Sequence, residues 1–349
     1  MEVSRVVTGR STTSPEDSVV IKFQDVTLRD GNHALRHSMT PEFVASYCRI
    51  ADKAGVYSVE VGHGNGIGAS SFLIGKASHS DRDLLSRARS ALTQTRLGVH
   101  VIPGFATAKR DIQPAIDLGV DVFRIGTHAT EATTARKHIE YLRSRDAYVQ
   151  GVLMMSHSVS VQTLVSQAKL LRSYGADAVV IMDSAGNYIH DDVRTRINAL
   201  VESLDCGIGF HAHNNLGVGI SNSLAAIDAG ASFIDGSAMG LGAGAGNAAL
   251  EAIVAIYRRR ASTPLQLQPL LDMSSLIETT FRDSLPRMTA VSIQSGNAGV
   301  FSGFAPHVKS VSQEYGISQE ELWTELGKRR LVAGQESMIR EVAKDLMNL

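Results

Sequence analysis

Short apolar runs and longer amphipathic segments alternate along most of the chain. Each run is rich in Val and Ile, as in a buried β-strand, and several follow the glycine that ends a helix before a short loop. The intervening segments have helical spacing; segment 40–55 opens with a threonine cap and a proline and closes on Gly55. The pattern predicts parallel strands alternating with helices. The predicted strand regions are 20–28, 56–62, 97–104, 120–128, 148–157, 176–184, 206–214 and 231–240.

The number of strands selects between two architectures. Eight strand–helix units close a (β/α)₈ barrel, whereas a doubly wound sheet usually has fewer strands and a glycine-rich fingerprint after the first. Here the first strand is followed by RDGNHA, which is not that fingerprint. We therefore expect an α/β fold, a (β/α)₈ TIM barrel over residues 19–261. Residues 1–18 are polar and predict a flexible N-terminal arm, and residues 262–349 predict a helical C-terminal domain.

Composition and charge argue against several classes of protein. The net charge is −1, without the basic excess that nucleic-acid binding usually requires. No apolar run reaches the length of about 18 residues that a membrane span needs, and no signal-peptide pattern is present. Cys48 and Cys206 lie far apart and form no C-x-x-C motif, so we interpret them as reduced thiols. We expect a cytoplasmic protein that binds neither nucleic acid nor membrane.

Charged and titratable side chains gather at two predicted strand ends. In a (β/α)₈ barrel the catalytic groups lie at the C-terminal ends of the strands. The first strand ends at Asp30, and the seventh carries His211 and His213, which face one side because they lie two residues apart. Strands one and seven are next-but-one neighbours, so the three side chains can converge. A lone His-x-His pair is more often a chance pair, but with the strand-end carboxylate it predicts a site for Mn²⁺, Fe²⁺, Co²⁺ or Zn²⁺.

Three more residues at the strand ends are candidates for chemistry. Arg29 offers a permanently charged donor fork suited to a carboxylate or a developing enolate oxygen; the alternative is an exposed surface arginine. His33 is either an acid/base or a loop histidine that caps the first helix. Ser184 either holds a substrate carboxylate or caps the next helix. The other histidines after strands are expected to support packing or loop structure: His63, His128 and His157.

The loop after the eighth strand, GLGAGAGN at residues 240–247, is rich in glycine. It has neither the G-x-G-x-x-G spacing of a dinucleotide site nor the G-K-[ST] ending of a phosphate-binding loop. We expect it to let the backbone approach the mouth of the barrel closely.

Several motifs in a fixed order resemble those of a known family. The chain contains TLRDGNHA, MMSH, SYGADAVVIMDSAG, HAHNN and GLGAGAGN in this order, and over roughly residues 20–348 it resembles the 4-hydroxy-2-oxovalerate aldolases. The resemblance implies a barrel with a partner-contacting helical C-terminal region. It also implies a carbon–carbon lyase, a class II pyruvate aldolase that reversibly cleaves a 4-hydroxy-2-oxo acid such as 4-hydroxy-2-oxopentanoate to pyruvate and an aldehyde. Related lyases and synthases carry a cysteine or glutamate in the glycine-rich loop, and this loop has neither.

The resemblance implies a role for each candidate residue. Asp30, His211 and His213 match the metal ligands of the family, with Mn²⁺ the usual ion and Co²⁺, Mg²⁺ or Zn²⁺ as alternatives. Arg29 would stabilise the pyruvate enolate, and His33 would remove the proton of the 4-hydroxyl group. No organic cofactor is expected.

The residues expected around the substrate depart from the family pattern. Phe301, in GVFSGFAPH, stands where the family has a tyrosine. His100 and Ile102, in VHVIPG, stand where the family has leucines that line the aldehyde pocket. The segments HAHNN and SAGNY replace HAHHN and SGGAM, and Ser184 lies in the second of them. An intact metal set in an altered pocket predicts the same reaction class on a different aldehyde, one that is larger, polar or aromatic.

Three hypotheses for the function follow. The first is a catabolic aldolase of aromatic-hydrocarbon breakdown that passes its aldehyde to an acylating aldehyde dehydrogenase partner. The second is a biosynthetic aldolase that joins a 2-oxo acid to a larger or aromatic aldehyde. The third, a non-catalytic scaffold, is disfavoured by the intact set of candidate residues. We also expect an oligomer.

Overall fold

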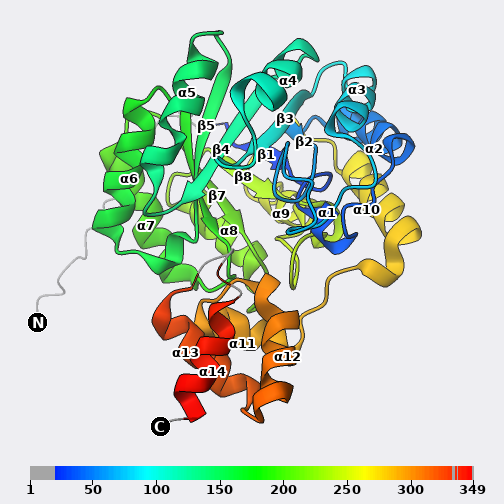
Figure 1. Cartoon of the computed structure of the whole chain (residues 1–349). Helices are drawn as coiled ribbons and strands as arrows, with labels where there is room; N and C mark the ends of the chain where they lie inside the picture. Colours follow the sequence, from blue (N-terminus) through cyan, green and yellow to red (C-terminus); the bar gives the residue numbers. More distant parts are fainter. Residues whose placement is uncertain (1–19, 332–334, 336, 348–349) are drawn as a thin grey trace, which may run out of the picture.

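The centre of the molecule is a closed barrel of eight parallel strands, described by a computed structural model that covers residues 20–331, 335 and 337–347 (Figure 1). The strands pair in chain order, and β1 also pairs with β8, which closes the barrel. The predicted (β/α)₈ barrel is confirmed, and the predicted arm at residues 1–18 lies outside the described residues. The strands are β1 (Lys22–Asp25), β2 (Ser58–Glu60), β3 (Arg96–Val101), β4 (Val122–His128), β5 (Tyr148–Met154), β6 (Ala178–Asp183), β7 (Gly207–Ala212) and β8 (Phe233–Gly236).

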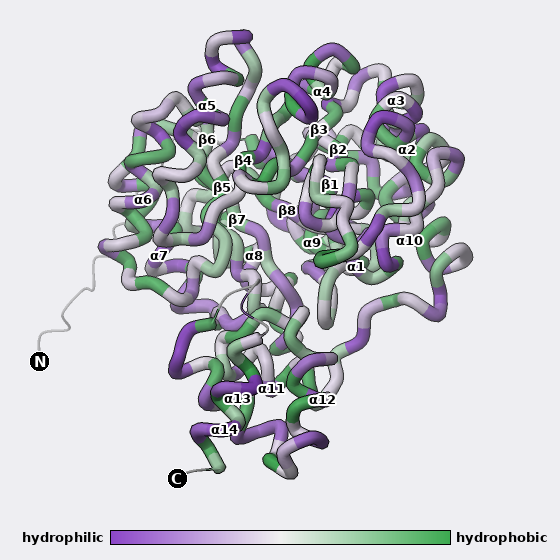
Figure 2. The backbone as a smooth tube through the Cα atoms, in the orientation of Figure 1, coloured by the Kyte–Doolittle hydropathy of each residue, from purple (hydrophilic) through white to green (hydrophobic). Residues whose placement is uncertain are grey.

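Helices follow the strands and form the outer layer, in which hydrophilic and hydrophobic stretches alternate (Figure 2). Helix α2 begins and ends as predicted: Thr40 accepts a hydrogen bond from the amide of Phe43 at 3.2 Å, and Gly55 ends the helix with a left-handed φ of 75°. Within the described ranges, no helix combines the length and the apolar character that crossing a membrane requires. The helices of this layer are α1 (Gly31–Ala34), α2 (Pro41–Ala54), α3 (Asp81–Ala91), α4 (Gln113–Asp117), α5 (Arg136–Arg143), α6 (Val161–Ser173), α7 (His190–Ser203), α8 (Gly219–Asp228), α9 (Leu250–Tyr257) and α10 (Leu267–Phe281).

The last four helices form a separate lobe beside the barrel (Figure 1). They are α11 (Ala290–Ala298), α12 (Ala305–Tyr315), α13 (Gln319–Arg329) and α14 (Met338–Met347), and they enclose their own apolar core around the buried Trp323. The sequence placed the start of the helical region at residue 262. In the structure, α10 packs on α2, and its Leu270 and Met273 belong to the barrel core. The second core therefore begins beyond α10.

Loops at the C-terminal ends of the strands hold the helical lobe against the barrel. Asn187, after β6, donates a hydrogen bond to the carbonyl of Gly296 at 2.7 Å. Asn215, after β7, donates to the carbonyl of Ser292 at 3.2 Å and to the hydroxyl of Ser302 at 2.6 Å. The C-terminal face of the barrel is thus the face next to the lobe.

The interior of the barrel carries several charged side chains. Because side chains alternate along a strand, every second residue points inward. Several of these inward positions hold ionisable groups that are at most 2% exposed. They come from five strands: Glu60, His100, Arg124, His211 and Asp235.

A buried polar contact joins α2 to β1 and generates a prediction on stability. The Tyr47 hydroxyl lies 2.8 Å from Asp25 Oδ2 and 2.9 Å from Thr27 Oγ1. Burial raises the pKa of Asp25 to about 6, although hydrogen bonds from Thr27 and Tyr47 oppose the shift. We expect Tyr47→Phe to lower the free energy of unfolding by about 1–3 kcal/mol, because a buried acceptor loses a donor.

The matched control is Tyr141→Phe, which removes a half-buried hydroxyl that donates to Gln113 Oε1 at 2.7 Å. Water can replace this partner, so the cost should stay below roughly 1 kcal/mol. Thermal unfolding followed by circular dichroism compares the two variants. Equal shifts in the unfolding midpoint would contradict the special role of Tyr47.

Candidate active site

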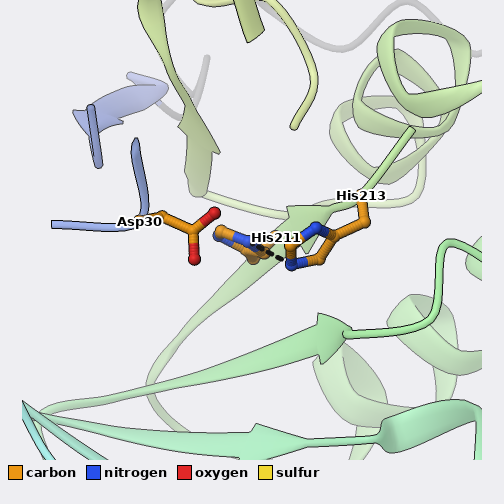
Figure 3. A group of neighbouring side chains, drawn as sticks. All are labelled: Asp30, His211 and His213. Carbon is orange, nitrogen blue, oxygen red and sulfur yellow. Dashed lines mark hydrogen bonds between the residues drawn. The ribbon is translucent and has the colours of Figure 1, made fainter. Parts of the chain in front are cut away.

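Asp30, His211 and His213 lie together at the C-terminal end of the barrel (Figure 3). Asp30 follows β1, His211 is on β7, and His213 follows that strand directly. One ligand atom from each of the three side chains lies within 4.8 Å of the others, and all three residues are buried. The two imidazoles approach closely, with 3.3 Å between their Nε2 atoms. The convergence expected from the strand order is therefore present in the fold.

The orientation of His211 is set by Asp235 on β8. His211 Nδ1 lies 3.0 Å from Asp235 Oδ2, so the ring carries its proton on Nδ1 and directs the Nε2 lone pair to the centre of the cluster. A histidine held in this way by a carboxylate is the usual arrangement of an imidazole metal ligand.

Both oxygens of Asp30 accept hydrogen bonds from fixed donors. Arg29 Nη1 donates to Oδ1 at 2.6 Å, and Asn247 Nδ2 donates to Oδ2 at 2.7 Å. Burial alone would raise the pKa of Asp30, but Arg29 and the nearby His213 outweigh it and hold the pKa well below its usual range. The side chain is thus an ionised and well-oriented carboxylate.

The donor set fits a divalent cation. Two imidazole nitrogens and a carboxylate oxygen suit Mn²⁺, Co²⁺ or Zn²⁺, and Mg²⁺ through the oxygen donors. Burial lowers the pKa of His213 to about 4 against the opposing effect of Asp30, so its ring is neutral near pH 7 and can act as a ligand. Asn247 Oδ1 is also buried and has no hydrogen-bond partner among the described residues. Asp30, His211 and His213 would hold the ion, with the Asn247 amide nitrogen orienting Asp30.

Arg29 is fixed on one side and free on the other. Its Nε donates to Glu60 Oε1 at 2.5 Å, and its Nη1 contacts Asp30 and the carbonyl of Gly64. Its Nη2 is buried and lacks a hydrogen-bond partner within the part of the chain that the structure describes. An unpaired guanidinium donor beside the three candidate metal ligands can donate a hydrogen bond to a substrate oxygen.

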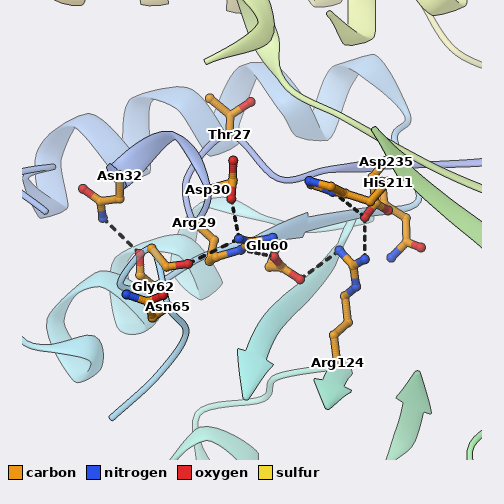
Figure 4. Close-up of polar contacts among 12 residues, drawn as sticks. Thr27, Arg29, Asp30, Asn32, Glu60, Gly62, Asn65, Arg124, His211 and Asp235 are labelled. Carbon is orange, nitrogen blue, oxygen red and sulfur yellow. Dashed lines mark hydrogen bonds and ion pairs between the residues drawn. The ribbon is translucent and has the colours of Figure 1, made fainter. Parts of the chain in front are cut away.

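Glu60 connects Arg29 to a second buried arginine (Figure 4). Glu60 Oε2 accepts from Arg124 Nη1 at 3.0 Å, and Arg124 Nη2 donates to Asp235 Oδ2. Burial would raise the pKa of Glu60, but Arg124 and Arg29 overcome it and lower the pKa to about 2. Because Asp235 also contacts His211, a continuous row of polar and charged side chains connects Asp30 to His211.

His33 lines a cavity of about 680 Å³ between the barrel and the helical lobe. The glycine-rich loop at Gly242 and Gly244 and the segment at Ser302 form other parts of the wall. Burial lowers the pKa of His33 to about 4, partly opposed by Asp30, so the imidazole is neutral near pH 7 and can accept a proton.

Two further histidines pack around the short helix α1, in which His33 lies. The His37 ring packs edge-on to His33, with 5.4 Å between centroids, and stacks on His63 at 3.6 Å. His37 Nδ1 accepts from the amide of Gly64, and His63 Nε2 bonds to the carbonyl of Gly75. These contacts agree with the structural role expected for His63, and His37 shares it.

The structure places the four expected substrate-pocket residues in different surroundings. His100 lies inside the barrel, and its buried Nδ1 finds no partner among the described residues; Ile102 is half-buried just beyond β3. The Ser184 hydroxyl accepts from the amide of Met155 at 3.0 Å, so it does not cap the next helix, and its O–H donates to no group among the described residues. The Phe301 ring packs at the edge of the helical lobe's core.

Comparisons with known proteins agree with the fold and with the two-part organisation. The HMGL-like family matches residues 20–277, and a DmpG-like communication domain matches residues 286–348. The chain belongs to the HMGL-like family. Within it, the chain is 51% identical to a 4-hydroxy-2-oxovalerate aldolase of Spirochaeta aurantia, covering 92% of this chain and 95% of that protein. It is 48% identical to the 4-hydroxy-2-oxovalerate aldolase of Pectobacterium atrosepticum, covering 92% and 94% of the two chains.

Similarity to solved structures extends to more distant relatives. The carboxyl transferase domain of Rhizobium etli pyruvate carboxylase superposes with a TM-score of 0.77 at 15% identity, covering 95% of this chain and 61% of that one. At this identity the likeness concerns the fold alone. This HMGL-like chain therefore shares its barrel fold with a protein of very different sequence.

Four residues of the candidate site were not predicted from the sequence. Three are charged side chains within otherwise apolar strands, and a buried charge in such a strand is a signal that opposite charges lie nearby. The fourth is the last residue of the glycine-rich loop and shows its role only through its contact with Asp30. The missed residues are Glu60, Arg124, Asp235 and Asn247.

The close approach expected of the glycine-rich loop occurs at Gly242 and generates a prediction. A Cβ at Gly242 would lie 2.6 Å from Asp30 Oδ2 and would also overlap the Asn247 amide. We expect Gly242→Ala to displace one of these groups and to weaken Mn²⁺ binding by about 10- to 100-fold, the usual effect of disturbing the residues around a metal ligand. Isothermal titration calorimetry on metal-stripped protein measures the affinity.

The control variant is Gly98→Ala on β3, where an added Cβ meets no atom closer than 3.6 Å. This substitution should leave the Mn²⁺ dissociation constant unchanged. The steric interpretation fails if both glycine variants bind Mn²⁺ as tightly as the wild type.

Proposed function

We propose that this chain is a divalent-metal-dependent pyruvate aldolase. It cleaves a 4-hydroxy-2-oxo acid, such as 4-hydroxy-2-oxopentanoate, reversibly to pyruvate and an aldehyde. The proposal is supported by the names of the curated relatives, which are 4-hydroxy-2-oxovalerate aldolases at about half identity over nearly the whole chain. The observation that carries it is the free Arg29 Nη2 beside the cluster of Asp30, His211 and His213.

The chemistry requires charge to move onto the 2-oxo group as the carbon–carbon bond breaks. A bound divalent cation supplies a Lewis acid that polarises this group. Arg29 Nη2 donates a hydrogen bond to the oxygen on which negative charge develops. Because Glu60 and Asp30 already hold the other nitrogens of Arg29, the donor is in position before the substrate arrives.

His33 is proposed as the base of the cleavage direction. Its imidazole faces the cavity through which the 4-hydroxyl group would be presented, and it is neutral near pH 7. It removes the hydroxyl proton as the aldehyde forms, and in the addition direction it returns the proton.

Mn²⁺ is the proposed ion. A carboxylate with two imidazoles is a mixed hard and borderline donor set, which suits this ion. Co²⁺, Mg²⁺ and Zn²⁺ are the alternatives that a titration must compare. No organic cofactor is proposed.

The aldehyde part of the substrate is proposed to contact His100, Ile102 and Phe301, and the Ser184 hydroxyl is proposed to hold the substrate carboxylate. The buried Nδ1 of His100 has no hydrogen-bond partner in the described part of the chain. This polar group favours an aldehyde with a hydrogen-bonding substituent over a plain alkyl aldehyde. The Phe301 ring contacts the helical core, so its part in the pocket requires a change of its side-chain position.

The helical lobe is proposed to bind an acylating aldehyde dehydrogenase. The match of residues 286–348 to a communication domain supports an interaction of this kind. It favours the catabolic hypothesis, in which the aldehyde passes to a partner, over the biosynthetic one. The expected oligomer stays a prediction.

The function is tested by measuring pyruvate release from 4-hydroxy-2-oxopentanoate with lactate dehydrogenase as the coupling enzyme. We expect activity that a chelator removes and Mn²⁺ restores. Arg29→Lys should lower kcat about 100- to 1,000-fold, because the ammonium group cannot replace the donor aimed at the developing charge.

Arg136→Lys serves as the control and should retain full activity. The Arg136 side chain is 62% exposed and forms an ion pair with Glu140. No pyruvate release with Mn²⁺, Co²⁺, Mg²⁺ or Zn²⁺ would refute the function. Full activity of Arg29→Lys would refute the role of Arg29 alone.

The pocket proposal predicts a change of aldehyde preference in His100→Leu. The variant should lose affinity for glycolaldehyde relative to propanal in the addition direction, by roughly 10-fold in the ratio of kcat/KM values, the effect of one hydrogen bond. The exposed His307→Leu is the control and should leave the ratio unchanged. An unchanged ratio in His100→Leu would remove His100 from the set of specificity residues.

A further inference from the structure

Six buried side chains form one continuous row between two of the proposed metal ligands (Figure 4). The row begins at a carboxylate and ends at an imidazole, and its charges alternate in sign along the way. Each member is at most 3% exposed. In order, the members are Asp30, Arg29, Glu60, Arg124, Asp235 and His211.

Arg124 is the central link of this row. It lies on β4, away from the strands that carry the ligands, and is 1% exposed. One of its terminal nitrogens donates to Glu60 at 3.0 Å, and the other donates to Asp235. The planar guanidinium is the side chain that can make both contacts from a single anchor.

Each half of the row ends in a group with a role in the proposed function. On one side, Asp235 fixes the tautomer of His211. On the other side, Glu60 fixes Arg29, which in turn contacts Asp30. Removal of the central cation would leave two carboxylates inside the barrel with one partner fewer each, and unpaired buried charges rearrange or take up protons.

We propose that Arg124 is a positioning residue that aligns His211 for metal binding and Arg29 for the developing negative charge. It does this without touching either the metal or the substrate. The inference rests on the proposed function, which supplies the roles of His211 and Arg29. It adds Arg124, on β4, as a residue on which the roles of both His211 and Arg29 depend.

A purely neutralising role for Arg124 makes a different prediction from a positioning role. Lysine carries the same charge on a flexible stem but is a point charge without the planar fork. If only the charge matters, Arg124→Lys behaves as the wild type. If the two-sided contact matters, the lysine variant folds yet loses alignment on at least one side.

The experiment compares Arg124→Lys, Arg124→Met and the wild type as full-length chains. Mn²⁺ affinity is measured by isothermal titration calorimetry on metal-stripped protein, and kcat is then measured at saturating Mn²⁺. Arg340→Lys is the matched control, because Arg340 makes its two-nitrogen contact with Glu314 on the surface of the helical lobe. Thermal unfolding of the metal-free proteins identifies variants that do not fold.

We expect Arg124→Lys to weaken Mn²⁺ binding about 10-fold and Arg124→Met up to about 100-fold, as for other residues that orient metal ligands. The kcat of the lysine variant should stay reduced when Mn²⁺ is saturating, because the misalignment of Arg29 is not repaired by more metal. If Arg124→Met does not fold, the lysine variant alone decides.

Two outcomes separate the inference from the proposed function. A wild type that binds no divalent metal and releases no pyruvate contradicts the proposed function. A wild type that does both, together with an Arg124→Lys variant of unchanged Mn²⁺ affinity and unchanged kcat, overturns the inference and leaves the function intact.

Discussion

The arrangement of the site depends on the two ion pairs of the Glu60 carboxylate, one with Arg29 and one with Arg124. A charge inside a barrel costs several kcal/mol unless an opposite charge and hydrogen bonds compensate it. Each oxygen of Glu60 therefore holds one arginine, and each arginine holds a further carboxylate, Asp30 or Asp235. The order of the charges is fixed because no member can move without leaving a neighbour unpaired. This constraint gives the site its rigidity before any ligand is bound.

The charged row divides the interior of the barrel into two unlike halves. The residues of the row come from the β1, β2, β4, β7 and β8 side, whereas the interior face of β5 and β6 carries an apolar cluster of Val152, Val180 and Met182. A barrel of this fold is usually filled by layers of branched apolar side chains. Here that apolar filling is kept on the β5 and β6 side, and charged side chains replace it where the row crosses the barrel.

Sequence periodicity was sufficient for the barrel and for the convergence of Asp30, His211 and His213, because both follow from local rules. Strand ends converge in any (β/α)₈ barrel, and a spacing of two places His211 and His213 on one face. The row of charges could not be predicted in the same way. Arg124 contacts both Glu60 and Asp235. These contacts depend on the strand register and on the reach of side chains across the closed barrel, and the sequence of a single strand predicts neither the register nor the reach. The isolated arginine in VDVFRIGTH showed only that a partner was needed.

The position of Phe301 shows why pocket residues are harder to predict than metal ligands. The neighbouring Ser302 contacts Asn215, and a Cβ at Gly244 would lie 2.5 Å from the Ser302 side chain. This part of the helical lobe is therefore pressed against the loop that carries Asn247, a neighbour of Asp30. The direction of the Phe301 ring depends on how the lobe sits on this loop, which is a property of two domains together. The same glycine-rich loop carries Gly244, next to Ser302, and Asn247, next to Asp30, so the lobe and the candidate metal ligands share one loop.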